Sequence, residues 1–428
     1  MSHGYRSPPL AMARTKTDRT MRAPRLLMLL HDYFPEEPRV ATEARAATAA
    51  GFDLTVVALR GPGEKSEEIV DGARVVRLPV RHEHGGAKFS LLGEYLRFTV
   101  LAAVHAVRIA RGARPDVVHV HNPPDFLVVA ALLPRLLGAK VVLDFHDLTP
   151  DMFMMRFDNR DGGIIDNSLR LVERLTANAS DAVLTVHEPY RQALGDNGVP
   201  IGKVSVVMNS LDETILPAPL VSEGAPESFR IVYHGTATPH YGVELIVDAV
   251  ALVRPQIPSV RFDVYAMGDA LPDVAARVRA HGLDDRVSIV PRFLPHEEVL
   301  RRVQGASVGV AANLPTRLSQ YALPTKILEY VAMGIPAVAP RLPTIREHFS
   351  DEEVWFFEPG DAESLAAALV AVSADPEAAA RRAENARSRY EAYRWPHSAR
   401  TYTDVLWRLA EKRRRGLAVQ RPTAAASS

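Results

Sequence analysis

Residues 321–340 read YALPTKILEYVAMGIPAVAP, an apolar segment bounded by prolines in which Lys326 and Glu329 stand three positions apart. Pro324 suits the first turn of a helix, so Thr325 and Lys326 fall in that turn and Glu329 follows one turn later. The apolar run IPAVAP that comes next is typical of a buried strand. The segment therefore predicts a helix followed by a buried strand, the unit from which parallel α/β sheets are built.

Strands and helices are expected to alternate in the same way along most of the chain. Runs that indicate strands include DLTVVAL at 53–59, AKVVLDFHD at 139–147 and FRIVYHG at 229–235, with helical stretches between them. Continuous rather than alternating apolar residues indicate strands that are buried on both faces. The pattern predicts an α/β protein of two doubly wound, Rossmann-like domains.

Composition indicates where these domains begin and end. The stretch LPAPLVSEGAPES is rich in Pro, Gly and Ser, which is typical of a linker. We expect a disordered leader (1–23), a first domain (24–215), this linker (216–228), a second domain (229–393), a helix that crosses back onto the first domain (394–412) and a disordered tail (413–428).

The bulk composition excludes several classes of function. The 428 residues carry a formal net charge of +0, so the basic field typical of nucleic-acid binding is absent and we expect no nucleic-acid partner. There is no cysteine, which excludes disulfides, thiolate catalysis and Cys-ligated metals. Fifteen histidines leave a His/carboxylate site possible in principle, but no HExxH-like spacing occurs and we expect no metal.

One long apolar stretch, FSLLGEYLRFTVLAAVHAVRIARGARP from Phe89, needs separate consideration. Glu94, Arg97, His105 and Arg108 interrupt it, so we do not expect it to span a membrane. It is expected to be an amphipathic helix that either covers the sheet or lies on a membrane surface. The expected location is cytoplasmic, with at most peripheral contact at the inner face of a membrane.

Ligands of open parallel sheets bind at the carboxyl ends of the strands, where helix N-termini present free N–H groups. The motif HGTATPHYG, after the strand at 229–235, suits close approach of the backbone to a phosphate. A lysine in the first turn of a helix opposes the helix dipole unless an anion binds there. Lys326 thus suits a diphosphate, and Glu329 suits vicinal hydroxyls as on a ribose. The alternative is a solvated ion pair between the two side chains.

Polar residues also follow the expected strands of the first half. Arg39 lies in HDYFPEEPRV, His121 and Asn122 in HVHNPPD, and His146 and Asp147 in DFHDLTPD. Several His and Asp residues at successive strand ends favour a functional site over isolated structural roles. We expect these strand-end residues to line the predicted cleft.

These residues resemble a known family. The half from IVYHG to IPAVAP resembles the donor domain of GT-B glycosyltransferases of family 4, and ALPTKILEYVAMGIPAVAP resembles the family's glutamate-containing helix. DVVHVHNPPDFLVVAALLPRLLGAKVVLDFHD and SDAVLTVHEPYRQAL resemble the acceptor half, and the resemblance covers about residues 24–412. It implies two facing Rossmann-like domains with a C-terminal crossover helix. It also implies a retaining, metal-independent enzyme that uses a nucleotide-sugar as co-substrate and needs no cofactor.

The resemblance also implies roles for individual residues. Glu329 would hold the ribose, Lys326 and Thr325 at the helix N-terminus the diphosphate, and His146 would lie near the donor sugar. His146 and Lys326 are accordingly the expected catalytic residues. The residues expected on the acceptor side are Arg39, His121, Asn122 and Asp147. The remaining donor-binding candidates are Gly235, Thr236, His240, Arg292, Phe293, Tyr321, Ala322 and Leu323.

The chain departs from the family pattern at three positions. Tyr321 stands where the family usually has a second glutamate, and Thr236 and Tyr241 stand where basic residues are usual, which leaves His240 as the nearest basic candidate. A bacterial glycosyltransferase that uses a UDP- or GDP-sugar is the leading hypothesis, with a small-molecule or lipid-linked acceptor. A GT-B sugar-nucleotide epimerase and a non-catalytic nucleotide-binding member are the alternatives.

Overall fold

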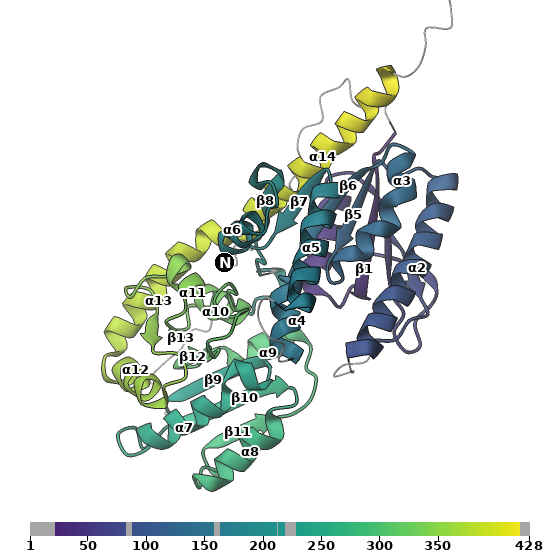
Figure 1. Cartoon of the computed structure of the whole chain (residues 1–428). Coiled ribbons are helices and arrows are strands. Elements are labelled where there is room, and N and C mark those ends of the chain that lie inside the picture. The colour runs from purple at the N-terminus through teal and green to yellow at the C-terminus, as the bar shows by residue number, and fades with distance from the viewer. Residues whose placement is uncertain (1–21, 83–87, 158–162, 212, 219–227, 420–428) are drawn as a thin grey trace, which may run out of the picture. The chain divides into compact units, whose positions relative to one another are not determined.

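A computed structural model describes residues 22–82, 88–157, 163–211, 213–218 and 228–419. The chain forms two compact units (Figure 1). The first contains the described residues up to Met208 and those from Ser398 onward, and the second runs from Asn209 to His397. Residues 209–218 belong to the second unit because Glu213 accepts hydrogen bonds from Arg394, at Nε–Oε1 2.7 Å and Nη2–Oε2 2.5 Å.

The segments expected to lack regular structure fall mainly outside the described residues. These are residues 1–21 of the expected leader, 219–227 of the expected linker and 420–428 of the expected tail. The last helix of the chain continues to Val419, past residue 413 where the tail was expected to begin.

The first unit is built on an eight-stranded sheet. Its spatial order is β3-β4-β2-β1-β5-β6-β7-β8, and every pair is parallel except β3 with β4. The five residues of β5, which read VVHVH, are all buried, including both histidines. The strands are β1 (Arg25–Tyr33), β2 (Asp53–Leu59), β3 (Glu67–Val70), β4 (Ala73–Leu78), β5 (Val117–His121), β6 (Lys140–Phe145), β7 (Ala182–Thr185) and β8 (Val204–Val206).

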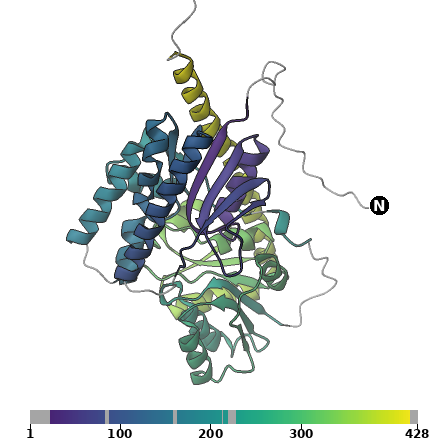
Figure 2. The same ribbon diagram turned by 90° about the vertical axis from the view of Figure 1, so that its right-hand side faces the viewer.

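Helices cover this sheet, with α2 among those that lie to one side of the strands in Figure 2. The α-helices are α1 (Pro38–Ala49), α2 (Lys88–Gly112), α3 (Leu132–Leu136), α4 (Thr149–Phe157), α5 (Ile164–Ala179) and α6 (Glu188–Asp196), and the 3-10 helices are η2 (Asp125–Ala131) and η3 (Ile201–Lys203). Helix α1 begins at a proline in its first turn and is capped by Glu37, whose carboxylate accepts the N–H of Val40.

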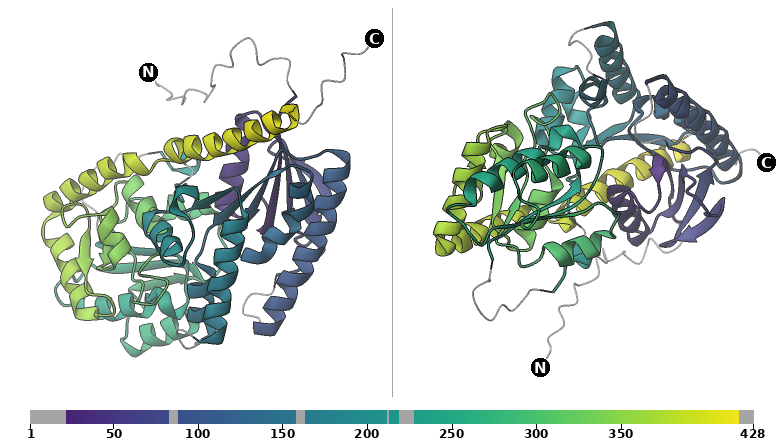
Figure 3. Two further views of the ribbon diagram at one scale, coloured as in Figure 1. Left: turned by 45° about the horizontal axis from the view of Figure 1, so that its top comes forward. Right: turned by 90° about the horizontal axis from the view of Figure 1, so that it is seen from below.

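Helix α14 (Trp395–Val419) returns to the first unit from Ser398 onward (Figure 3). The Trp407 ring packs on Phe52, with 5.0 Å between ring centroids. The Tyr402 hydroxyl lies 3.2 Å from Nδ1 of His119, and Arg413 pairs with buried Asp116. Packing and polar contacts together hold the helix against this sheet.

Helix α2 is the one helix among the described residues that is long and apolar enough, over Ser90–Gly112, to cross a membrane by length and composition. The helix nevertheless packs against η2, α3 and β1, and the expectation that it does not span a membrane stays a prediction. A stripe of side chains spaced four residues apart is exposed on it. The stripe consists of Leu92, Leu96, Val100 and Val104, of which Val100 is 62% exposed.

The second unit contains a six-stranded sheet in the order β11-β10-β9-β12-β13-β14, with every pair parallel. Its strands are β9 (Arg230–Thr236), β10 (Arg261–Met267), β11 (Val287–Val290), β12 (Val308–Val310), β13 (Ala337–Pro340) and β14 (Trp355–Phe357). Its α-helices are α7 (Val243–Val253), α8 (Leu271–Ala280), α9 (His296–Val303), α10 (Thr325–Ala332), α11 (Pro343–His348), α12 (Ala362–Ala374) and α13 (Pro376–Tyr390), with 3-10 helices η4 (Glu213–Ile215), η5 (Pro239–Tyr241) and η6 (Glu391–Tyr393).

Two glycines position the segments that surround α10. A Cβ on Gly309 in β12 would lie 2.4 Å from the Tyr330 ring, so only glycine lets α10 pack this closely on the sheet. Gly242 has a φ of 64° and its Cβ would lie 2.2 Å from the carbonyl oxygen of Ala312. The loop after β9 is thereby held against the segment that leads to α10.

Candidate functional site

Lys326 and Glu329 are both buried in α10, with relative exposures of 7% and 6%. The solvated ion pair that their spacing allowed is therefore wrong. Within the described part of the chain, no carboxylate lies within ion-pair distance of the Lys326 ammonium. A buried cation without an anionic partner is energetically costly, so its environment needs an explanation.

Two aromatic rings and a glycine surround the Lys326 side chain. Nζ lies 5.0 Å from the centroid of the Tyr233 ring and 4.9 Å from that of Tyr241, both within cation–π range. A Cβ on Gly235 would lie 3.8 Å from Cε of Lys326, so strand β9 also approaches closely. Burial lowers the pKa of Lys326 to about 8, against the attraction of Glu329. The aromatic faces offset only part of the desolvation of this cation.

The N-terminus of α10 adds hydrogen-bond donors beside this lysine. Pro324 is the N-cap residue and makes no side-chain capping bond. Ile327 donates to the carbonyl of Pro324, while Thr325 and Lys326 occupy the two preceding positions of the first turn. N–H groups in the first turn of an uncapped helix are available to an anion. The start of α10 therefore combines a buried cation with backbone N–H groups that no side chain caps.

Glu329 lies between two histidines that sequence reasoning missed. Its Oε2 is 3.1 Å from Nε2 of His234, and its Oε1 is 3.0 Å from Nε2 of His296. Burial opposes ionisation, but these two histidines and Lys326 outweigh it and lower the pKa of Glu329. His234 is the histidine of the motif IVYHG and could have been noticed there, whereas nothing in the sequence connects His296 with Glu329.

The other predicted donor residues lie at or after the carboxyl ends of strands of the second unit. Gly235 and Thr236 are exposed at the end of β9, and His240 contacts the Thr238 hydroxyl at 3.1 Å. Tyr321, Ala322 and Leu323 are partly buried in the segment before α10, and Arg292 and Phe293 are exposed after β11. The Phe293 side chain is 78% exposed.

In the first unit, His146 follows β6 and is joined to His121 and Asp144. Its Nε2 lies 3.0 Å from Nδ1 of His121 and 3.3 Å from Oδ2 of Asp144. The side chains of His121 and Asp144 are fully buried, whereas that of His146 is 11% exposed. His146 is therefore the member of this group that a substrate could reach.

Asn122 fixes the backbone that carries His146. Its Oδ1 accepts the N–H of His146 at 2.7 Å, and its Nδ2 donates to the carbonyl of Asp147 at 2.7 Å. Asn122 is buried, so the structure places it beneath the turn. It thereby positions both residues that follow the strand. Burial raises the pKa of Asp147, although His146 opposes this effect.

Arg39 lies underneath the same group. Its Nε and Nη2 each lie 3.0 Å from an oxygen of Asp144, and Nη1 donates to the carbonyl of Val207 at 2.6 Å. Its side chain is 4% exposed, so it supports Asp144 from below and does not line an open acceptor surface. Asp144, which sequence reasoning missed, stands two residues before His146 in DFHD.

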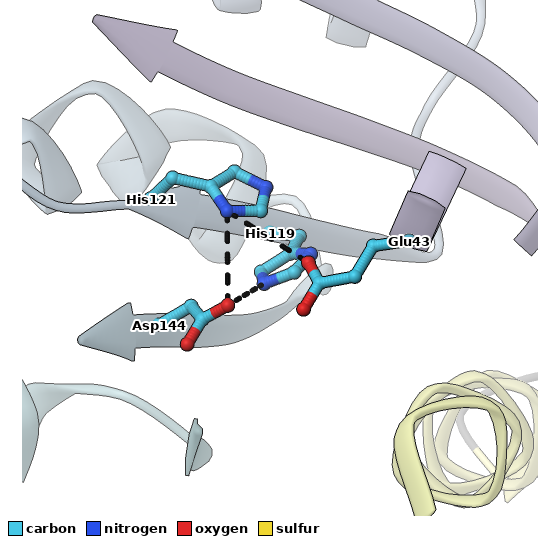
Figure 4. A group of neighbouring side chains, drawn as sticks. All are labelled: Glu43, His119, His121 and Asp144. Carbon is cyan, nitrogen blue, oxygen red and sulfur yellow. Dashed lines mark ion pairs between the residues drawn. The ribbon is translucent and has the colours of Figure 1, made fainter. Parts of the chain in front are cut away.

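Four buried side chains beside Arg39 have ligand atoms within 4.8 Å of one another, namely Glu43, His119, His121 and Asp144 (Figure 4). Although burial opposes it, Arg39 holds the pKa of Asp144 well below its usual value, while burial raises the pKa of Glu43 well above it. Burial also lowers the pKa of both histidines. An arginine–aspartate pair thus already balances the charge of this group, and a metal ion would have to displace it.

Comparison with known proteins identifies the fold. The profile of the family "Glycosyl transferase 4-like domain" matches residues 37–210, and that of "Glycosyl transferases group 1" matches residues 228–375. The chain belongs to the GT-B glycosyltransferases of family 4. This glycosyltransferase is a transferase enzyme, and its two parallel-sheet α/β domains are those of the GT-B fold.

Individual relatives of this glycosyltransferase agree with the family. The glycogen synthase of Mycobacterium tuberculosis is 27% identical over 369 residues, covering 80% of this chain and 83% of that protein. Sucrose-phosphate synthase from Thermosynechococcus elongatus superposes with a TM-score of 0.72 at 19% identity, covering 91% and 99% of the two chains. The structure of Anabaena Alr3699/HepE with UDP and glucose gives a TM-score of 0.65 at 14% identity, covering 89% and 99%.

Replacing Lys326 by Met is expected to stabilise the ligand-free enzyme at pH 7, because it removes a buried charge. The pKa of Lys326 is lowered from 10.5 to about 8, so below pH 8 the lysine is charged in both the folded and the unfolded state. Between pH 8 and 10.5 the folded state releases the proton first, and the wild type gains up to about 3 kcal/mol of stability as the pH rises. The stability advantage of Lys326→Met over the wild type should therefore shrink between pH 8 and pH 10.5.

Urea unfolding at pH 7 and pH 9.5 measures this difference, with Lys140→Met as the matched control. Lys140 forms a partly exposed pair with Asp181 at 3.3 Å. Two results would contradict a destabilising buried charge at this position. One is a stability advantage of Lys326→Met that does not change with pH, and the other is a variant that is less stable than the wild type at pH 7.

Proposed function

We propose that the chain is a retaining glycosyltransferase that moves a sugar from a UDP- or GDP-sugar to an acceptor hydroxyl. The observation that carries the proposal is the buried Lys326 ammonium beside the uncapped N-terminus of α10. The Anabaena neighbour, whose structure contains UDP and glucose, supports a UDP-sugar in particular. The chain's resemblance to its family supports retention.

The predicted donor-binding residues of the second unit have the following roles in this proposal. The diphosphate binds the Lys326 ammonium and the N–H groups of Thr325 and Lys326. Glu329 accepts hydrogen bonds from the ribose hydroxyls, and His234 and His296 fix the carboxylate in place. Exposed Phe293 offers an aromatic face to the base. Gly235 lets the phosphate approach the backbone beside Lys326.

The chemistry follows from these roles. The bond between the anomeric carbon and the phosphate oxygen breaks as a bond forms from the acceptor oxygen to the same face of that carbon. The leaving phosphate oxygen takes the proton of the acceptor hydroxyl, so no enzyme nucleophile is needed. Lys326 and the helix N–H groups stabilise the charge that develops on the diphosphate, and a metal ion is not required for this step. His146 donates a hydrogen bond to the donor sugar.

Two classes of acceptor fit the features of the first unit. The exposed stripe Leu92, Leu96, Val100 and Val104 on α2 supports a lipid-linked acceptor and a cytoplasmic enzyme that is peripheral at the inner face of a membrane. The net charge of +0 suits a soluble small-molecule acceptor equally well.

Titration with UDP, GDP and ADP in the presence of EDTA tests the nucleotide site. One nucleotide is expected to bind, and Lys326→Ala and Glu329→Ala should each weaken its binding by about 1–3 kcal/mol, because each removes a charge-assisted hydrogen bond. Glu384→Ala is the matched control, since Glu384 pairs with Arg387 on the surface. Failure to bind any of the three nucleotides, or unchanged affinity in both site variants, would refute the nucleotide site.

His146→Ala is expected to leave nucleotide affinity unchanged and to reduce the rate of donor turnover by about 10- to 100-fold, the effect of losing one transition-state hydrogen bond. Nucleotide release from UDP- or GDP-sugar, with and without acceptor, measures the rate. His281→Ala is the control, because His281 pairs with Asp248 on the second unit. An unchanged rate would remove His146 from the site, and conversion of the donor without acceptor would favour the epimerase.

Co-sedimentation with anionic vesicles separates the two acceptor classes. If the acceptor is lipid-linked, the protein should pellet with the vesicles, and Val100→Asp should abolish this because it places a charge within the apolar stripe. Asp replacement of exposed Ile69, on β3 of the same unit, is the control. Full recovery of the wild type in the supernatant would count against the lipid-linked class.

A further inference from the structure

A second group of metal-ligating side chains lies in the first unit, apart from the residues assigned to the glycosyltransferase reaction. His31 comes from the carboxyl-terminal part of β1, His82 follows β4 by four residues, and Glu94 lies in the second turn of α2. Oε1 of Glu94 is 3.0 Å from Nε2 of His31 and 2.7 Å from Nδ1 of His82. One carboxylate oxygen therefore holds together three elements that are far apart in sequence.

The strand is irregular at the point where it presents His31. The register between β1 and β2 shifts between Leu29 and Tyr33, which is typical of a β-bulge. Bulges redirect side chains and are enriched beside functional sites. Here the shift accompanies a histidine that is turned towards α2, where it contacts Glu94.

His31 itself is in an unusual state for a structural histidine. Its side chain is 2% exposed, and its Nε2 makes no hydrogen bond of acceptable geometry despite its closeness to Glu94. Edge-to-face rings of Tyr95 and Phe98, with centroids 4.7 and 5.0 Å away, enclose the imidazole. A buried imidazole nitrogen that lacks a hydrogen bond is available as a ligand for a metal ion.

The side chain of Glu94 is 9% exposed and that of His82 is 22% exposed, so the group has a path to solvent.

We propose that His31, His82 and Glu94 bind a Zn²⁺ ion that fastens the segment after β4 to β1 and α2. Their three ligand atoms already lie within 4.8 Å of one another. Zinc with ligands at about 2.0–2.1 Å in a tetrahedron needs them about 3.4 Å apart, which small side-chain movements achieve. Two imidazoles and a carboxylate suit zinc, and water would complete the fourth position. The site is independent of the proposed transfer reaction, in which no residue of this group takes part.

Metal titration of the full-length protein tests the proposal. Protein freed of metal with EDTA and then dialysed should bind one equivalent of ZnCl₂ by calorimetry, and CoCl₂ should produce the visible absorption bands of tetrahedral cobalt. Saturation with ZnCl₂ should raise the melting temperature, because the ion binds only the folded state. His82→Ala and Glu94→Gln should each weaken zinc binding at least about 10-fold.

His105→Ala is the matched control. His105 lies on the same helix, where its Nδ1 contacts the carbonyl of Leu101 at 3.0 Å, and its replacement should leave the zinc affinity unchanged. Circular dichroism of the metal-free variants establishes that they fold. No uptake of zinc by the wild type would overturn the proposal, as would a full equivalent retained by both folded variants, which would locate the ion elsewhere in the chain.

Discussion

The burial of the Lys326 ammonium is the constraint on which the second unit depends. Removing this cation from water is unfavourable, and the rings of Tyr233 and Tyr241 compensate only in part, as the lowered pKa of the lysine indicates. Strand β9 contacts the lysine side chain at Gly235, and α10 packs closely on β12 because residue 309 is a glycine. These features make sense together if a diphosphate supplies the missing negative charge, so that binding energy compensates for a cost already present in the free protein.

In the first unit, in contrast, a buried cation has an anionic partner. Arg39 and Asp144 neutralise each other through two hydrogen bonds, and burial raises the pKa of Glu43. Asp144 in turn lies 3.3 Å from the partly exposed imidazole of His146 and supports it from below. One unit thus presents an unsatisfied cation and the other a rigidly supported histidine. A transferase needs both functions, because the leaving group requires charge stabilisation and the sugar requires positioning.

The structure shows where the residues that depart from the family pattern lie. Tyr321 replaces a usual glutamate in a partly buried segment, and Thr236 replaces a usual basic residue at the exposed end of β9. Neither change alters Lys326 or the start of α10. In the proposed site, Lys326 and the uncapped helix end supply the positive charge, and the Thr238 hydroxyl contacts His240 at 3.1 Å. The pairing of Glu329 with two histidines is a feature that the family pattern alone did not indicate.

The sequence by itself determined the two α/β domains, the helix that contains Lys326 and Glu329, and the strand ends that carry His121, Asn122 and His146. It did so because continuous apolar runs, helix-starting prolines and strand-end polar residues are local properties of the chain. Only the tertiary structure decided that Lys326 and Glu329 are buried and unpaired with each other, since an i,i+3 spacing is the same for a surface pair and a buried one. It also decided that Arg39 lies beneath its site, because its partner Asp144 is 105 residues away. Contacts of this kind depend on how elements pack, and no local pattern records them.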